Sequence, residues 1–209
     1  MKKSDETKTR ILEVSLRLFN ALGTGEVSTN HIASTAGMSP GNLYYHYRNK
    51  EEIICGIVEN MIVDMEKLWQ AQEGSPLESR ELRRKLSGTL SLMWEYRFFC
   101  REVNVILGRD EKLRNRYLSA RNGQFQQMRT FLEKLFKRQD LNKKEHSEVL
   151  DDLMRISRLV GEYWLSDLDV GGSRVDSGRI EEGANLMLES FRPYLYPDAF
   201  KELIKKPVQ

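Results

Sequence analysis

The sequence is poor in the residues that interrupt helices or build disulfide and metal sites. It holds 5 prolines and 2 cysteines among 209 residues, and no proline lies between Leu77 and Arg192. Cys55 and Cys100 are far apart in the chain, which argues against a disulfide framework and favours a reducing cytoplasm. The three histidines and two cysteines show no metal-ligand spacing, so we expect neither a metal site nor a cofactor.

Long apolar runs are also missing. No run approaches the roughly 20 apolar residues that a membrane-spanning helix needs. Polar residues follow Met1, Lys2 and Lys3, which is unlike a signal peptide. Clean alternation of apolar and polar residues is absent, which argues against a β-rich fold. Hydrophobic residues make up 40% of the chain and charged residues 31%, a composition typical of a chain with an apolar core and no membrane partner.

The net charge is small but unevenly distributed. Residues 1–50 hold seven Lys or Arg and four Asp or Glu, whereas the whole chain carries only +2. The N-terminal segment is therefore mildly basic and the remainder slightly acidic. This asymmetry permits a polyanionic partner near the N-terminus but is too weak to indicate one by itself.

Helical periodicity and helix start signals occur along most of the chain, which predicts an all-α fold. Gly23 should end the first helix, Ser28 should cap the second, and Ser39 followed by Pro40 should begin a short third. Gly74 marks a candidate subdomain boundary. The expected helices span about residues 5–22, 28–36, 39–47, 49–72, 76–96, 98–107, 110–138, 143–168 and 178–192, with a short helix after Pro197.

The first three helices fit a helix-turn-helix pattern, in which one helix lies against the phosphate backbone and the next enters the major groove. In the third helix, Leu43 and Tyr47 are four residues apart and should point inward. The remaining side chains of this helix then face solvent or DNA, with Tyr45 at the border. Asn42 can donate and accept hydrogen bonds at a base edge, and the Tyr44 hydroxyl can reach a phosphate oxygen.

The candidate DNA contacts combine this third helix with polar residues at the starts of the second and fourth helices. Gly41 lets the backbone approach DNA closely, and Lys50 adds its charge to a helix N-terminus, where a phosphate is favoured. The predicted DNA-binding residues are Thr29, Asn30, Ser39, Pro40, Gly41, Asn42, Tyr44, Tyr45, His46 and Lys50.

Six runs in the first quarter of the chain form a specific pattern: Thr9-Arg10-Ile11-Leu12, Leu18-Phe19, Ile32-Ala33, Ala36-Gly37-Met38-Ser39, Gly41-Asn42-Leu43-Tyr44-Tyr45-His46-Tyr47 and Asn49-Lys50-Glu51-Glu52. This pattern resembles the DNA-binding domain of TetR-family regulators. The run that begins at Gly41 is the most specific part of the resemblance, and family members often carry Lys or Arg where this chain has Pro40.

The resemblance implies a homodimeric, ligand-responsive transcription factor, usually a repressor, that binds a (pseudo)palindromic operator of double-stranded DNA. Residues 1–50 would form the helix-turn-helix DNA-binding domain, the fourth helix at 50–72 would connect, and residues 51–209 would form a helical effector-binding and dimerisation domain. Two DNA-reading heads must reach successive major grooves about 34–36 Å apart. A small-molecule effector that moves the heads by a few ångströms would therefore lower operator affinity.

An aromatic segment at residues 94–103 predicts one wall of an effector pocket, and ordinary helix packing explains it equally well. An arginine that faced into such a pocket would favour an anionic ligand, because a buried charge needs a partner. The candidate pocket residues are Trp94, Arg97, Phe98, Phe99, Arg101, Val103, Leu107, Tyr117, Phe125, Met128 and Trp164.

Two apolar stripes, on the expected helices at 143–168 and 178–192, are candidates for the dimer interface. Small residues in both stripes would let the helices approach closely. The same stripes could instead form an intramolecular core. The interface candidates are Leu153, Ser157, Val160, Gly161, Trp164, Ala184, Met187, Leu188 and Phe191.

Two other classes of function fit the sequence less well. A helical enzyme would need a nucleophile–base pair or a metal cluster, and the sequence shows neither, so we expect no enzyme. An adaptor could keep the helix-turn-helix fold and bind a protein partner without reading an operator. Such an adaptor would not need the polar side chains of Asn42, Tyr44, His46 and Lys50.

Overall fold

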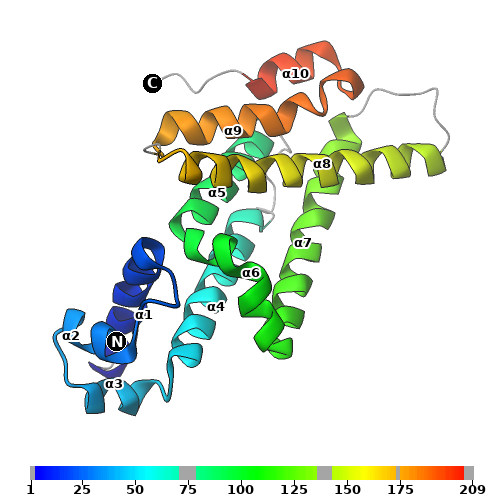
Figure 1. The fold of residues 1–209 in the computed structure, drawn as a ribbon. Helices are drawn as coiled ribbons and strands as arrows, with labels where there is room; N and C mark the ends of the chain where they lie inside the picture. The colour runs from blue at the N-terminus through cyan, green and yellow to red at the C-terminus, as the bar shows by residue number, and fades with distance from the viewer. Residues whose placement is uncertain (1–2, 71–78, 136–142, 173–174, 205–209) are drawn as a thin grey trace. The chain divides into compact units, whose positions relative to one another are not determined.

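The computed structural model describes residues 3–70, 79–135, 143–172 and 175–204, and the regular elements in these ranges are all helices (Figure 1). The all-α prediction is confirmed, with each expected helix present to within a few residues at its ends. None of the described helices combines the length and the hydropathy that crossing a membrane requires. The elements are α1 (Lys3–Leu22), α2 (Thr29–Thr35), α3 (Pro40–His46), α4 (Lys50–Trp69), α5 (Ser79–Glu95), α6 (Arg97–Arg109), α7 (Glu111–Leu135), α8 (Lys143–Val170), α9 (Ser177–Glu189), the 3₁₀ helix η1 (Arg192–Tyr194) and α10 (Pro197–Ile204).

The ends of the first four helices follow local residue types. The Ser28 hydroxyl accepts a hydrogen bond from a backbone N–H of the first turn of α2 (3.1 Å), and the Ser39 hydroxyl does the same for α3 (3.3 Å). Asn49 Oδ1 caps α4 by accepting from the N–H of Glu52 (2.8 Å). Gly23 ends α1 with a φ of 80°, a conformation that costs other residues about 1–2 kcal/mol. These predicted start and stop positions are confirmed.

The chain folds into two compact units that do not follow the order of the sequence. Unit 1 comprises Met1–Asp64 and Tyr96–Arg116, and unit 2 comprises Met65–Glu95 and Tyr117–Gln209. The helix α6 therefore belongs to the same unit as the first three helices, and α4 continues from one unit into the other. The predicted division at residue 50 neither places α6 with the first three helices nor divides α4 between the units, because both features depend on packing. The predicted boundary at Gly74 lies outside the described residues.

Apolar side chains from α1, α2, α3, the N-terminal part of α4 and α6 form the core of unit 1. Ile11, Ile32 and Leu43 are fully buried. The rings of Phe19 on α1 and Phe98 on α6 lie with their centroids 5.5 Å apart, and both side chains are fully buried. Burial of such a side chain contributes about 1.5–3 kcal/mol, so the docking of α6 is part of what stabilises this unit.

Unit 2 has the larger apolar core, formed by the C-terminal end of α4 together with α5, α7, α8, α9 and α10. The helices α8 and α9 run side by side (Figure 1). Their close approach depends on glycines: a Cβ at Gly161 would lie 2.9 Å from Sδ of Met187, and a Cβ at Gly183 would overlap Trp164. The expectation that Gly161 permits close helix packing is confirmed within one chain.

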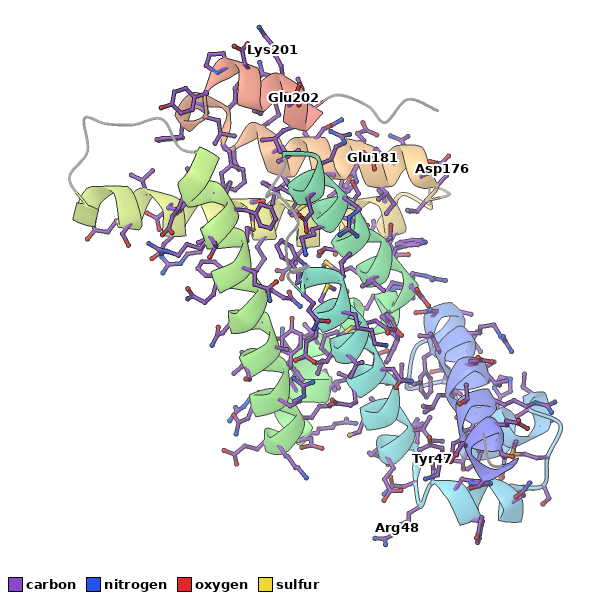
Figure 2. The ribbon with its side chains drawn as sticks, turned by 180° about the vertical axis from the view of Figure 1, so that it is seen from behind. Tyr47, Arg48, Asp176, Glu181, Lys201 and Glu202 are labelled. Carbon is purple, nitrogen blue, oxygen red and sulfur yellow. The ribbon has the colours of Figure 1, made fainter. Side chains whose placement is uncertain are left out.

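Arg83 is a buried cation that joins three helices of unit 2. Its guanidinium, on α5, donates to Glu181 Oε2 (2.5 Å) and Asn185 Oδ1 (2.8 Å) on α9, and to the carbonyl oxygen of Leu203 on α10 (2.8 Å). Figure 2 labels Glu181 on α9, on the side that meets α5. Because a buried charge without partners is costly, these bonds fix how α9 and α10 attach to α5.

Lys85, two residues further along α5, holds the end of α4. Its buried ammonium donates to the carbonyl oxygens of Leu68 in the last turn of α4 (3.0 Å) and of Gln70 just after it (3.2 Å), where helix geometry leaves carbonyl oxygens available as acceptors. Burial lowers the pKa of Lys85, and the nearby carboxylate of Glu81 opposes part of that change. This residue therefore caps α4 from a neighbouring helix.

Candidate nucleic-acid interface

A tight turn centred on Gly37 joins α2 to α3. Gly37 adopts a φ of 65°, and the N–H of Met38 donates to the carbonyl oxygen of Ala33 (3.0 Å). The helix α2 packs against both α1 and α3, with Ile32 and Leu43 buried between them. This arrangement is a helix-turn-helix, and it leaves one face of α3 in solvent.

The exposed face of α3 carries the side chains that the sequence predicted. Tyr44 is 47% exposed and Tyr45 is 82% exposed, so Tyr45 lies further from the core than the border position we expected. His46 is half-buried, with its ring edge-on to Tyr45 (centroids 5.2 Å apart). Tyr47 is half-buried too, and burial raises the pKa of its hydroxyl, with a smaller contribution from the charge of Glu52. The other predicted contacts of this segment, all exposed, are Ser39, Pro40, Gly41 and Asn42.

The start of α2 contributes to the same surface through Thr29. Its hydroxyl lies 2.8 Å from the Tyr44 hydroxyl, so the two predicted DNA contacts are hydrogen-bonded to each other. The next residue, Asn30, is exposed. The bond fixes the direction of the Tyr44 phenol before any ligand arrives, which reduces the entropy lost on binding.

Lys50 is placed differently from our expectation. We expected its charge to add to the N-terminus of α4, but its ammonium donates to the carbonyl oxygens of Thr24 (2.6 Å) and Val27 (3.0 Å). The side chain is half-buried as a result. Lys50 therefore stabilises the loop of residues 23–28 between α1 and α2, and a phosphate contact by its remaining N–H stays a prediction.

Two exposed arginines near this surface were absent from the sequence prediction. Arg48 lies two residues after the end of α3, its side chain is 89% exposed, and it points away from the ribbon in Figure 2. Arg10 on α1 is exposed, and a Cβ at Gly37 would lie 3.3 Å from its Nη2, so this guanidinium lies beside the turn. Sequence position alone could have indicated Arg48. The place of Arg10 depends on how α1 packs against α2.

The predicted effector-pocket residues divide between the two units. In unit 1, Phe98 packs on Phe19 and Arg101 donates to the carbonyl oxygen of Asn20 (2.8 Å), which are contacts of ordinary helix packing. In unit 2 the aromatic candidates lie partly buried at the edge of the core. Unit 1 holds Arg97, Phe98, Phe99, Arg101, Val103 and Leu107, and unit 2 holds Trp94, Tyr117, Phe125, Met128 and Trp164.

The predicted dimer residues lie mostly in the intramolecular core of unit 2, which was the alternative to an interface. The indole N–H of Trp164 donates to the carbonyl oxygen of Arg179 in the first turn of α9 (3.0 Å), and Val160 is half-buried. The stripes face each other because α8 and α9 of one chain pack together. The buried members are Leu153, Ser157, Gly161, Ala184, Met187, Leu188 and Phe191.

A different apolar face of α8 and α9 is exposed. Ile156, Leu159 and Tyr163 follow one another at helical spacing on α8 and are 47%, 56% and 74% exposed. Leu186 on the adjacent α9 is 42% exposed. Periodicity alone could not distinguish this face from the buried one, because both α8 faces carry apolar residues.

An exposed helix that packs on two other helices, and is joined to one of them by a tight turn, is the arrangement of helix-turn-helix DNA-binding proteins. Residues 11–55 match the family model for bacterial regulatory proteins of the tetR family, and residues 61–203 match the TetR model for bacterial transcriptional repressors. The second match covers more than half of the chain, so this protein belongs to the TetR family of transcriptional regulators. It is a DNA-binding regulator and not an enzyme.

Individual relatives agree with this assignment. The chain is 35% identical to the transcriptional regulator AcrR of Shigella flexneri over 79 residues, and 30% identical to QacR of Staphylococcus aureus over 124 residues. These matches cover 36% and 54% of this chain, and they span 37% and 65% of the two relatives. The fold resembles a TetR-family regulator from Marinobacter aquaeolei, with a TM-score of 0.79, 28% identity, and coverage of 98% of this chain and 96% of that one.

Proposed function

We propose that this regulator represses transcription by binding a (pseudo)palindromic operator as a homodimer, and that a small-molecule effector releases it. The exposed face of α3 carries the proposal: Asn42, Tyr44 and Tyr45 are exposed, while Leu43 anchors the helix from its buried side. The Asn42 amide can donate to and accept from an adenine edge. The Tyr44 hydroxyl, oriented by Thr29, contacts a phosphate oxygen.

Basic residues around α3 supply the attraction to the phosphate backbone. Arg48 and Arg10 are exposed guanidiniums, one two residues after α3 and one beside the turn before it. Phosphate contacts release counterions, so the logarithm of affinity should fall linearly with the logarithm of salt concentration. These arginines offset the neutral Pro40 at the position where the family often has a charge.

The Tyr44→Ala variant tests the DNA-binding role. The probe is a duplex selected from a random pool by the wild-type protein, and affinity is measured by fluorescence anisotropy. We expect Tyr44→Ala to weaken binding at least about tenfold, since a hydrogen bond to a charged group such as a phosphate contributes about 1.5–3 kcal/mol. The control is Tyr196→Ala, because Tyr196 is a comparably exposed tyrosine in unit 2 (43%). Equal affinity of both variants, or binding that does not depend on salt, would contradict the proposal.

The homodimer part of the proposal uses the exposed apolar face of α8 and α9. A contiguous apolar patch on a folded surface marks an interaction site, and an operator with two half-sites requires two heads. Leu159→Glu should convert the dimer to a monomer in sedimentation analysis, because a carboxylate cannot be buried there without a partner. The matched control is Val105→Glu on α6, which changes an equally exposed valine (51%) and should leave the dimer intact.

The effector part of the proposal rests on family membership and on the partly buried aromatic residues of unit 2. Trp94, Phe125 and Trp164 each pack partly buried against its core, and partly buried aromatic side chains of this kind suit an apolar ligand. Compounds that release the selected duplex from the wild-type protein would identify the effector. Phe125→Ala should then shift the dose response and leave DNA affinity without compound unchanged. Cys55 and Cys100 are not joined in a disulfide, which suits the reducing cytoplasm that we propose as the location.

A further inference from the structure

The loop of residues 23–28 is held from two sides by groups of opposite charge. The backbone N–H of Thr24 donates to Glu102 Oε1 (2.9 Å), and the Thr24 hydroxyl donates to Oε2 of the same carboxylate. The Thr24 carbonyl oxygen accepts from the ammonium of Lys50 (2.6 Å). Three polar groups of one loop residue thus bind side chains from two helices, α6 and α4.

The absence of a side chain at Gly23 leaves room for the carboxylate of Glu102 beside the loop. A Cβ at Gly23 would lie 3.3 Å from Glu102 Oε1, so a larger residue would crowd the carboxylate. The start of α6 is itself fixed to the end of α1, because Asn20 Oδ1 accepts from the N–H of Phe98 (3.0 Å) and the Asn20 carbonyl accepts from Arg101 (2.8 Å). Glu102 therefore extends from a helix that cannot easily shift relative to α1.

The loop leads directly to the proposed DNA contacts. Lys50 also binds the carbonyl oxygen of Val27, Ser28 caps α2, and Thr29 bonds to Tyr44. Every step from Glu102 to Tyr44 is a hydrogen bond or a short stretch of backbone. A displacement of Thr24 thus moves the start of α2 and, with it, the hydroxyl that orients Tyr44.

We infer that Glu102 is a positioning residue for DNA binding: its carboxylate holds Thr24 and keeps the Thr29–Tyr44 pair in the geometry that contacts a phosphate. The inference rests on the proposed function. The chain passes from unit 2 into unit 1 at the start of α6. Through Glu102, this helix contacts the loop that leads to the DNA-binding residues.

Three variants of the full chain test the role of Glu102 on the duplex selected by the wild-type protein. Glu102→Ala should weaken binding about tenfold, because it removes two bonds to a charged acceptor. The loss should disappear in a Tyr44→Phe background, because the Tyr44 hydroxyl is the group that Glu102 is proposed to position. Glu102→Gln should restore affinity to within about threefold, since the amide can accept from the Thr24 N–H and donate to its hydroxyl oxygen. Glu26→Ala is the control, because Glu26 is an exposed carboxylate of the same loop, and this variant should bind at least as well as wild type.

A double-mutant cycle with Tyr44→Phe separates positioning from simple destabilisation. A smaller folded fraction lowers apparent affinity by the same factor with or without the Tyr44 hydroxyl, so an equal loss from Glu102→Ala in the wild-type and Tyr44→Phe backgrounds would overturn the inference. Should Glu102→Ala fold poorly, Thr24→Val removes only the hydroxyl, and we expect a loss of about threefold that likewise disappears in the Tyr44→Phe background. Wild-type affinity in both variants would refute the positioning role alone. Failure of the wild-type protein to select any duplex would refute the proposed function and this inference together.

Discussion

The two units are both helical, yet they use their polar side chains differently. In unit 1, polar side chains bind backbone groups of a loop or of the first turn of a helix. Examples are the hydroxyl of Ser28, the carboxylate of Glu102 and the ammonium of Lys50. In unit 2 the buried cations Arg83 and Lys85 tie the ends of whole helices around a larger apolar core. Unit 1 therefore fixes the geometry of a small surface, and unit 2 fixes the attachment of its helices.

This contrast has consequences for how each unit should respond to mutation. A change in the polar contacts of unit 1 should alter DNA binding more than global stability, because each contact orients only a few residues. A change in the buried cations of unit 2 should alter stability most, because breaking a buried ion pair leaves an uncompensated charge. Three sets of substitutions test the contrast at decreasing size of effect.

The largest effect is expected for Arg83→Met. We expect it to lower the free energy of unfolding by about 3 kcal/mol, at the low end for a broken buried pair because Glu181 keeps some solvent contact. Chemical denaturation measures the loss, and hydrogen exchange should rise in α10 and not in α2 and α3. The neighbouring Arg84 is 56% exposed, so Arg84→Met should change stability by less than about 0.5 kcal/mol. Equal losses in the two variants would remove the distinction between the units.

An intermediate effect on stability is expected in the helix-turn-helix, where alanine at two nearby glycine positions should change the stability in opposite directions. Gly37→Ala should destabilise this segment by about 1–2 kcal/mol, because Gly37 has a φ of 65°. Gly41→Ala should stabilise α3 by about 0.5–1 kcal/mol, since open space surrounds Gly41 and alanine favours helix. Yet Gly41→Ala should weaken operator binding if the backbone approaches DNA there. Local hydrogen exchange and anisotropy measure the two properties separately, and the same sign of stability change in both variants would contradict this expectation.

The smallest expected effect is on the reactivity of the Cys55 thiol in unit 1. Burial and then the hydrogen bond to Asp110 (3.4 Å) raise the pKa of Cys55 from 9.0 to about 11. The protonated thiol thus favours the folded state, a contribution that is complete below pH 9 and is lost as the pH rises to about 11. Asp110→Asn keeps an oxygen to accept the N–H of Leu113 and removes a charge that raises this pKa.

We expect Asp110→Asn to speed alkylation of Cys55 by about two- to threefold at mildly alkaline pH, because burial, the main cause of the shift, remains. Mass spectrometry of the Cys55 peptide measures the rate, with Cys100 in the same sample as the reference for the reagent. A slower reaction in the variant would show that the carboxylate does not hold the proton on sulfur.

Local residue types made most of the helices predictable. Ser28, Ser39 and Asn49 begin helices, and Gly23 ends one, because the backbone groups they satisfy lie within a few residues. The inward Leu43 and the outward Tyr44 followed from helical spacing. The partners of Lys50 and Glu102 did not, because Thr24 is 26 and 78 residues away from them.

The sequence by itself determined the number and approximate ends of the helices and, through the motif at Gly41 to Tyr47, the family. Those properties depend on capping, periodicity and turn residues, all of which act over a few positions. Tertiary structure decided that α6 belongs with the DNA-reading helices and that the apolar stripes of α8 and α9 face each other within one chain. Two faces of an amphipathic helix can look alike in sequence, and only the packing of distant segments selects which one is buried.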